Sequence, residues 1–124
     1  MLSYSVYKVI HLTGVFMVVM ALGGAVMAAL SEKEGRHPGR KWIGMTHGMG
    51  LVIALFGGFG LLARIEIHWP WPLWVWLKMA LWLLLGGFIA MIYKKAQAHP
   101  ILWWVVLVLP IIGAILAQSK IGSM

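Results

Sequence analysis

The stretch LWVWLKMALWLLLGGFIAMIY, residues 73–93, decides the fold. It runs for 21 residues with one charge, Lys78. A helix rises about 1.5 Å per residue and the hydrocarbon core of a bilayer is roughly 30 Å thick, so about 20 apolar residues can cross it. Because a lysine inside such a segment costs on the order of 3 kcal/mol, we expect Lys78 to face a partner or a wet cavity. The stretch predicts a membrane-spanning helix that carries a functional cation.

The composition of the whole chain is typical of an integral membrane protein. Of its 124 residues, 62% are hydrophobic and 10% are charged, and the mean hydropathy is +0.92. A soluble core of this size cannot bury so much apolar surface. The formal net charge of +7 comes from basic residues between apolar runs, where membrane orientation and lipid phosphate explain them without a nucleic-acid partner. The absence of cysteine excludes disulfides, iron–sulfur clusters and a cysteine nucleophile.

Four apolar segments of about the length of a membrane span follow one another. They cover residues 6–30, 42–63, 73–93 and 101–118. The first is too long for the apolar part of a signal peptide and has no basic leader, so we expect it to be a span. Pro110 predicts a kink or a locally satisfied break in the fourth. The predicted fold is all-α: one domain, residues 1–124, forming an integral membrane four-helix bundle with up-down-up-down topology.

The distribution of lysine and arginine predicts the orientation of the bundle. The connections after the first and third segments carry six basic residues, against three on the other side. The six are Lys33, Arg36, Arg40, Lys41, Lys94 and Lys95, and the three are Lys8, Arg64 and Lys120. Since cytoplasmic loops are enriched in lysine and arginine, both termini are predicted to lie outside the cytoplasm.

Small residues predict close contacts between the helices. Gly44 and Gly48 have GxxxG spacing, and Gly57, Gly58 and Gly60 follow on the same segment. Such residues let helix backbones approach closely in lipid. They favour a compact bundle and require no function.

The depth of the polar side chains predicts which of them share a site. His11 and Lys78 lie about seven and five residues outward of the midpoints of their segments, so both are within roughly 10 Å of the midplane, on the outer side. His47 lies inward of the midpoint of its segment, on the order of 20 Å from His11 along the membrane normal. His11 and Lys78 can therefore meet, whereas His11 and His47 cannot clamp one haem.

These side chains also have structural interpretations. We expect His47 to hydrogen-bond to a neighbouring helix, as buried polar groups generally do. Lys78 can extend to the outer surface along its own stem. Alternatively, Trp74 and Trp82, four residues to either side, enclose its ammonium by cation–π contact or line a flat aromatic ligand. The loop histidines are expected to be solvated; they are His37, His68 and His99.

Several of these segments resemble a known family. YKVIHLTGV (residues 7–15) and WVWLKMALWLLLGG (residues 74–87) are similar to the corresponding spans of the HemJ family of protoporphyrinogen oxidases. In that family, a histidine in the first span and a lysine following a tryptophan in the third are the characteristic pair. LVIALFGGFGLLAR (residues 51–64) and the proline of the fourth segment fit the same layout. The residues that carry over are His11 and Lys78.

The resemblance implies a bacterial inner-membrane protein that binds haem b or a related porphyrin in its outer half. His11 and Lys78 would be its catalytic pair if it is an oxidoreductase, acting in electron transfer or porphyrin oxidation. By its chemistry, His11 would ligate the haem iron and Lys78 would pair with a propionate. Met79 or Met17 would be the second iron ligand, and the cofactor site would also include Trp74, Trp82 and Tyr7.

A second hypothesis comes from a different class of protein. None of the three acidic residues lies within an apolar segment, so an acidic ligand or another chain is the natural counter-ion of Lys78. The protein would then be a non-catalytic subunit of a larger membrane complex, or a homo-oligomer, with its glycines packing helices together. A transporter is a third hypothesis, which a homodimer would make more plausible.

Overall fold

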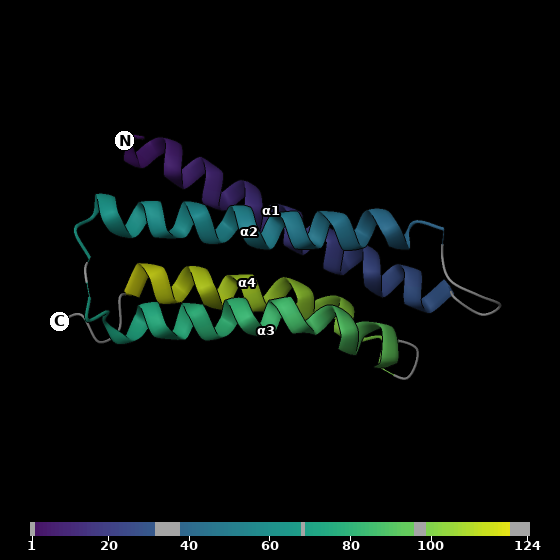
Figure 1. Ribbon diagram of the computed structural model, residues 1–124. Coiled ribbons are helices and arrows are strands. Elements are labelled where there is room, and N and C mark those ends of the chain that lie inside the picture. Colours follow the sequence, from purple (N-terminus) through teal and green to yellow (C-terminus); the bar gives the residue numbers. More distant parts are fainter. Residues whose placement is uncertain (1, 32–37, 68, 96–98, 120–124) are drawn as a thin grey trace.

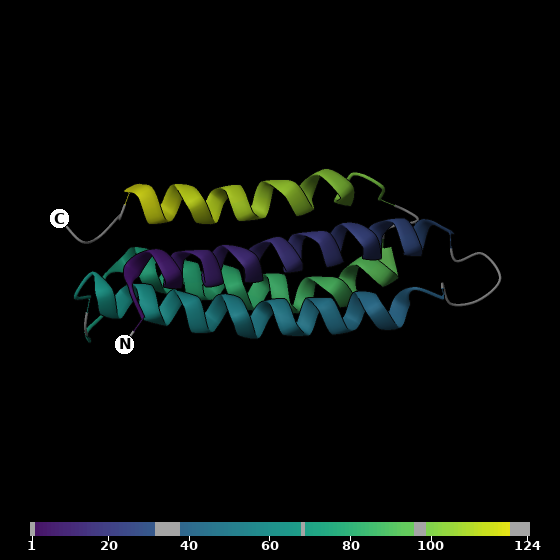
Figure 2. The ribbon, with the colours of Figure 1, turned by 90° about the horizontal axis from the view of Figure 1, so that it is seen from above.

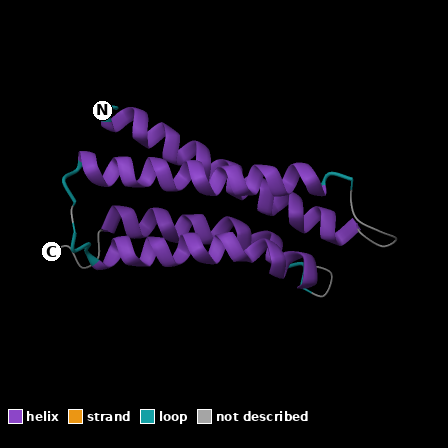
Figure 3. Ribbon diagram, in the orientation of Figure 1, coloured by secondary structure: helices purple, strands orange, loops and turns teal. Residues whose placement is uncertain are grey.

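The computed structural model describes residues 2–31, 38–67, 69–95 and 99–119. Within these ranges the chain forms four α-helices, and the remaining described residues are turns and connections (Figures 1 and 3). The helices are α1 (Tyr4–Ser31), α2 (Arg40–Arg64), α3 (Leu73–Lys95) and α4 (Leu102–Ser119). Each helix begins and ends within two residues of its predicted segment, and the all-α prediction is confirmed.

The helices differ in their capacity to cross a bilayer. In the described ranges α1, α2 and α3 are long and apolar enough to cross, and α4 is a shorter apolar helix. Its 18 residues span about 27 Å. The helix continues through Pro110, so the predicted segment is not divided into two helices there. The structure therefore has the helices of a membrane protein.

Helices that are consecutive in the sequence run antiparallel. α1 begins and α4 ends at one end of the bundle, where α2 also connects to α3 (Figures 1 and 2). The opposite end is the basic end, defined by Arg40, Lys41, Lys94 and Lys95. Lys8, Arg64 and Lys78 are the described lysine and arginine residues in the other half of the bundle. The charge bias thus has the predicted direction; Lys33, Arg36, His37, His68 and Lys120 lie outside the described residues.

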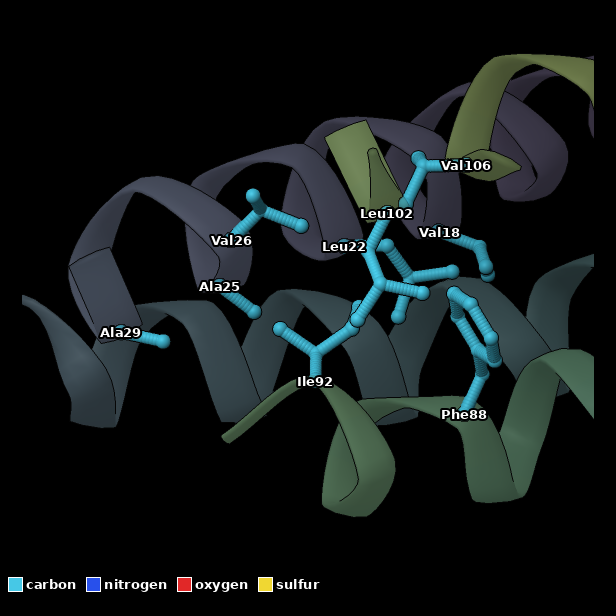
Figure 4. Packing of buried hydrophobic residues seen from close by; sticks show 9 residues of the cluster. All are labelled: Val18, Leu22, Ala25, Val26, Ala29, Phe88, Ile92, Leu102 and Val106. Atoms are coloured by element: carbon cyan, nitrogen blue, oxygen red, sulfur yellow. The ribbon is translucent and has the colours of Figure 1, made fainter. Parts of the chain in front are cut away.

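The hydrophobic core lies in the half of the bundle nearest the basic end. Leu22 and Val26 of α1 and Ile92 of α3 are fully buried. They pack with residues of α4, as Figure 4 shows. The whole cluster comprises Val18, Leu22, Ala25, Val26, Ala29, Phe88, Ile92, Leu102 and Val106. The core therefore joins α1, α3 and α4 and leaves the other half of the bundle to be packed differently.

Glycines set the contact between α1 and α2. Gly57 faces the backbone of His11, and a Cβ at Gly57 would overlap it. Gly14 faces the backbone of Ala54 in the same way. Small residues thus bring these two backbones together, as expected for helices packed in lipid.

The GxxxG pair at the start of α2 does not take part in this packing. Gly44 and Gly48 are exposed, and no described atom of another helix lies within 4 Å of a Cβ built on either. The interpretation that this pair packs the bundle together is therefore wrong. An apolar helix shows no polar face that would distinguish its inward glycines from its outward ones.

The end opposite the basic end is closed by aromatic rings. We call it the aromatic end, defined by Phe59, Trp69, Trp71 and Trp76. The ring centroids of Trp71 and Trp76 are 5.1 Å apart, and those of Phe59 and Trp71 are 5.7 Å apart. α2 ends here because the N–H groups of Glu66 and Ile67 bond to the carbonyls of Ala63 and Leu62. This turn places the α2–α3 connection beside the first turn of α3.

Candidate functional site

A cavity of about 180 Å³ lies near the aromatic end, mainly between α2 and α3. α1 contributes Tyr4 and His11, and α4 contributes Ala117. Four of the five predicted site residues line this cavity: His11, Trp74, Lys78 and Trp82. The structure therefore brings together the imidazole and the ammonium that the sequence places at one depth.

His11 is held in one orientation by α2. Its Nδ1 lies 2.7 Å from the backbone oxygen of Ala54. Because a carbonyl oxygen only accepts, Nδ1 must carry the hydrogen and donate it. Nε2 makes no hydrogen bond with any residue that the structure describes. A histidine that ligates a metal usually donates its other ring N–H in this way, so the arrangement suits ligation through Nε2.

Two glycines of α2 make this orientation possible. Gly57 admits the backbone of His11, as described above. A Cβ at Gly58 would lie 3.4 Å from both Cε1 and Nδ1 of the imidazole. The ring therefore rests on a stretch of α2 that has no side chains, one turn from the carbonyl that orients it.

Lys78 is half-buried on α3, about 7.5 Å from the start of that helix. It lies within electrostatic range of His11. In the described part of the chain it has no hydrogen-bond or ion-pair partner. The one carboxylate among the described residues, Glu66, follows the end of α2 and does not line the cavity. A negative charge for Lys78 must come from a ligand, another chain or a residue outside the described ranges.

The two tryptophans beside Lys78 differ in their hydrogen bonding. Trp82 donates from Nε1 to the backbone oxygen of Leu51, at 3.0 Å. Trp74 is 5% exposed, and its buried Nε1 has no hydrogen-bond partner among the described residues. Neither indole makes a cation–π contact with Lys78 in those residues; the one observed there joins Arg40 to Tyr93. The tryptophans therefore line the cavity and do not enclose the ammonium.

The remaining predicted ligands separate into two groups. Met79 lines the cavity, on the same wall as Lys78, and Met17 does not. Tyr7 packs against Gly60 and has its ring centroid 6.1 Å from that of Phe56, outside the cavity lining. Tyr4, one turn before Tyr7, lines the cavity. Of the predicted ligands, Met79 thus remains a candidate by position, and Tyr7 lies beside the site.

His47 has the structural role predicted for it. It is 5% exposed, and its Nε2 donates to the backbone oxygen of Leu85, at 3.1 Å. It does not line the cavity that contains His11. His99 is exposed in the connection before α4. His47 therefore links α2 to α3 and does not share a site with His11.

The described residues offer a metal ion few side-chain donors. The described ranges contain no group of three or more histidine, cysteine, aspartate or glutamate side chains that could hold a metal ion. A bare ion would find one imidazole in the cavity, whereas haem iron already has four nitrogen ligands and needs only axial ones. Comparison of the chain with protein-family models, curated proteins and solved structures finds no match. The cavity is therefore the feature from which a function can be inferred.

Proposed function

We propose that this is a multi-pass membrane protein of HemJ-like type that binds haem b or a related porphyrin in the cavity between α2 and α3. One observation carries the proposal. The hydrogen bond from Nδ1 of His11 to Ala54 leaves Nε2 available as a ligand, in a cavity that also contains the unpaired ammonium of Lys78. Imidazole is a common axial ligand of haem iron.

The proposed location is a bacterial inner membrane, with both termini outside the cytoplasm. Three helices long enough to cross and a fourth apolar helix in the described ranges support a multi-pass protein. Arg40, Lys41, Lys94 and Lys95 at the basic end, against Lys8, Arg64 and Lys78 in the other half, support a cytoplasmic basic end. The cavity then opens in the outer half of the membrane.

The residues present fit the polar parts of haem. His11 offers an imidazole, Met79 a thioether on the facing wall, and Lys78 a cation for a propionate. The cavity of about 180 Å³ is smaller than the roughly 300–1,000 Å³ typical of ligand sites. It would therefore enclose only part of a macrocycle unless α2 and α3 move apart.

The chain itself would orient the imidazole of His11 and would balance the negative charge of the ligand with Lys78. Haem held here would supply one-electron transfer, which is the basis for an oxidoreductase in electron transfer or protoporphyrinogen oxidation. The Ala54 carbonyl fixes the tautomer of His11 and raises the basicity of Nε2. Lys78 would hold a negative group where little water competes for it.

The test is the absorption spectrum of the purified protein after haemin supplementation, oxidised and reduced. We expect a Soret band that is lost or shifted in His11→Ala. His47→Ala is the matched control, because it removes an equally large ring that lies outside the cavity, and it should keep the band. A colourless wild type, or an unchanged band in His11→Ala, would contradict the proposal.

A second candidate function is that of a non-catalytic subunit of a larger membrane complex. The contact-free face of α2 at Gly44 and Gly48 favours it, because such a face lets another helix approach closely. An acidic side chain of the partner would then pair with Lys78. Co-purification of partner chains in fixed stoichiometry with a colourless product would support this function over haem binding.

A further inference from the structure

The polar groups of the cavity are arranged by depth. Trp74, Lys78 and Trp82 follow one another along α3 in steps of four residues, about 6 Å each. His11 bonds to Ala54, ten residues before the end of α2, so its ring lies about 15 Å inside the aromatic end. Trp74 therefore lies nearest the aromatic end, and Lys78, His11 and Trp82 lie deeper in the cavity.

The Trp74 indole is an unexplained feature of this arrangement. It is a buried donor without an acceptor among the described residues, which typically costs about 1–3 kcal/mol. It lies one helical turn from Lys78 on the same face of α3. The two residues thus offer two kinds of nitrogen donor, one of them charged, beside an apolar wall.

We propose that Lys78 and Trp74 form a carboxylate site, and that the ligand is an amphiphilic carboxylic acid. Its acid group would lie toward the aromatic end, and its apolar body would extend toward His11 and Trp82. The inference deepens the proposed function, since haem and porphyrins carry propionates. A membrane fatty acid presents the same chemistry, and the experiment distinguishes the two sources.

Charge balance favours a carboxylate over a phosphate monoester. Lys78 is the one lysine or arginine among the described residues that line the cavity. One carboxylate neutralises it, whereas a doubly charged phosphate would leave a negative charge unpaired at a wall of Leu55, Leu62 and Val75. A buried ammonium is stabilised most by a charge-assisted hydrogen bond of this kind.

The first arm of the experiment compares haemin with haemin dimethyl ester, which has the same macrocycle without free acids. Soret titration of the detergent-purified wild type should show about tenfold or more preference for the diacid. Lys78→Met should abolish that preference, and Lys78→Arg should retain most of it. Trp74→Phe, which keeps the ring and removes the N–H, should reduce it severalfold. Trp104→Phe, outside this cavity, is the matched control and should leave it unchanged.

The second arm uses cis-parinaric acid and its methyl ester, followed by the fluorescence of the fatty acid. If haemin does not bind but the free fatty acid is preferred in a manner that requires Lys78 and Trp74, the haem proposal fails and the carboxylate site stands. If haemin and its ester bind equally, the haem proposal stands and the carboxylate site is overturned. If neither haemin nor cis-parinaric acid binds, the carboxylate site is also overturned. Thermal unfolding of each variant shows that a loss of preference is not a loss of fold.

Discussion

The two faces of α2 pack against their neighbours in different ways. Against α1, backbone meets backbone, and Gly57 leaves no room for a side chain. Against α3, contacts are few, and two side chains bridge the gap by donating to backbone carbonyls. His47 reaches from α2 to Leu85, and Trp82 reaches from α3 to Leu51.

The difference indicates how the cavity can adapt to a ligand. The α1–α2 wall, which carries His11, is fixed by backbone contact and by the bond to Ala54. The α3 wall, which carries Lys78, is joined to α2 by two side-chain hydrogen bonds that can lengthen or re-form. The core contacts of α3 with α1 and α4 lie nearer the basic end. A ligand larger than the present cavity is therefore expected to move α3 and to leave the position of the imidazole unchanged.

The largest expected effect comes from the fixed interface. Gly57→Ala should lower the free energy of unfolding by about 3 kcal/mol, because a Cβ there meets the backbone of His11 and forces α1 away. It should also weaken haemin binding by displacing the imidazole. Gly87→Ala on α3 is the matched control, since no described neighbouring atom lies within 4 Å of its Cβ. Denaturation in mixed detergent measures both variants, and equal stabilities would refute the backbone contact.

A smaller effect is expected from the bridge that His47 makes. His47→Ala should lower the free energy of unfolding by about 2 kcal/mol, because it removes a buried ring together with its hydrogen bond. Unlike Gly57→Ala, it should spare haemin affinity, since His47 lies outside the cavity. The same unfolding assay, paired with a haemin titration, separates the two effects. If His47→Ala lost as much haemin affinity as His11→Ala, haemin binding would depend on the hydrogen bond between His47 and Leu85, contrary to this prediction.

The sequence is sufficient to predict the helices and the level of the site. Apolar length sets the helix bounds, and counting residues along the helices places His11 and Lys78 at one depth. Rotation about each helix axis is not predictable in this way, because helices that are apolar all round show no buried face. The sequence therefore cannot distinguish Tyr4 from Tyr7, or Gly48 from Gly57, by the direction in which each faces. The carbonyls of Leu51 and Ala54, which accept hydrogen bonds from Trp82 and His11, are not predictable for another reason. Every residue has a backbone carbonyl, so the sequence does not show which ones accept a side-chain hydrogen bond.

The bridge made by Trp82 should contribute less than that of His47. Trp82→Phe removes the N–H bond to Leu51 but keeps most of the ring, so we expect a loss of about 0.6 kcal/mol, the average for hydrogen bonds between membrane helices. The variant should still bind haemin. Trp104→Phe makes the same change of ring without removing this hydrogen bond. The difference between the two unfolding free energies therefore measures the contribution of the bond to Leu51. A cost approaching that of Gly57→Ala would show that α3 is held as firmly as α1.

A small effect of opposite sign is expected on the face of α2 that carries Gly48. Gly48→Ala meets no described atom of another helix within 4 Å, so it should gain up to about 1 kcal/mol from the better helix propensity of alanine. If this face is covered by a partner helix, the added methyl groups would instead separate the two backbones. The variant would then lose both stability and oligomeric state, measured by unfolding and by size-exclusion chromatography with light scattering. The sign of this one substitution therefore distinguishes a lipid-facing α2 from an α2 that lies at a subunit interface.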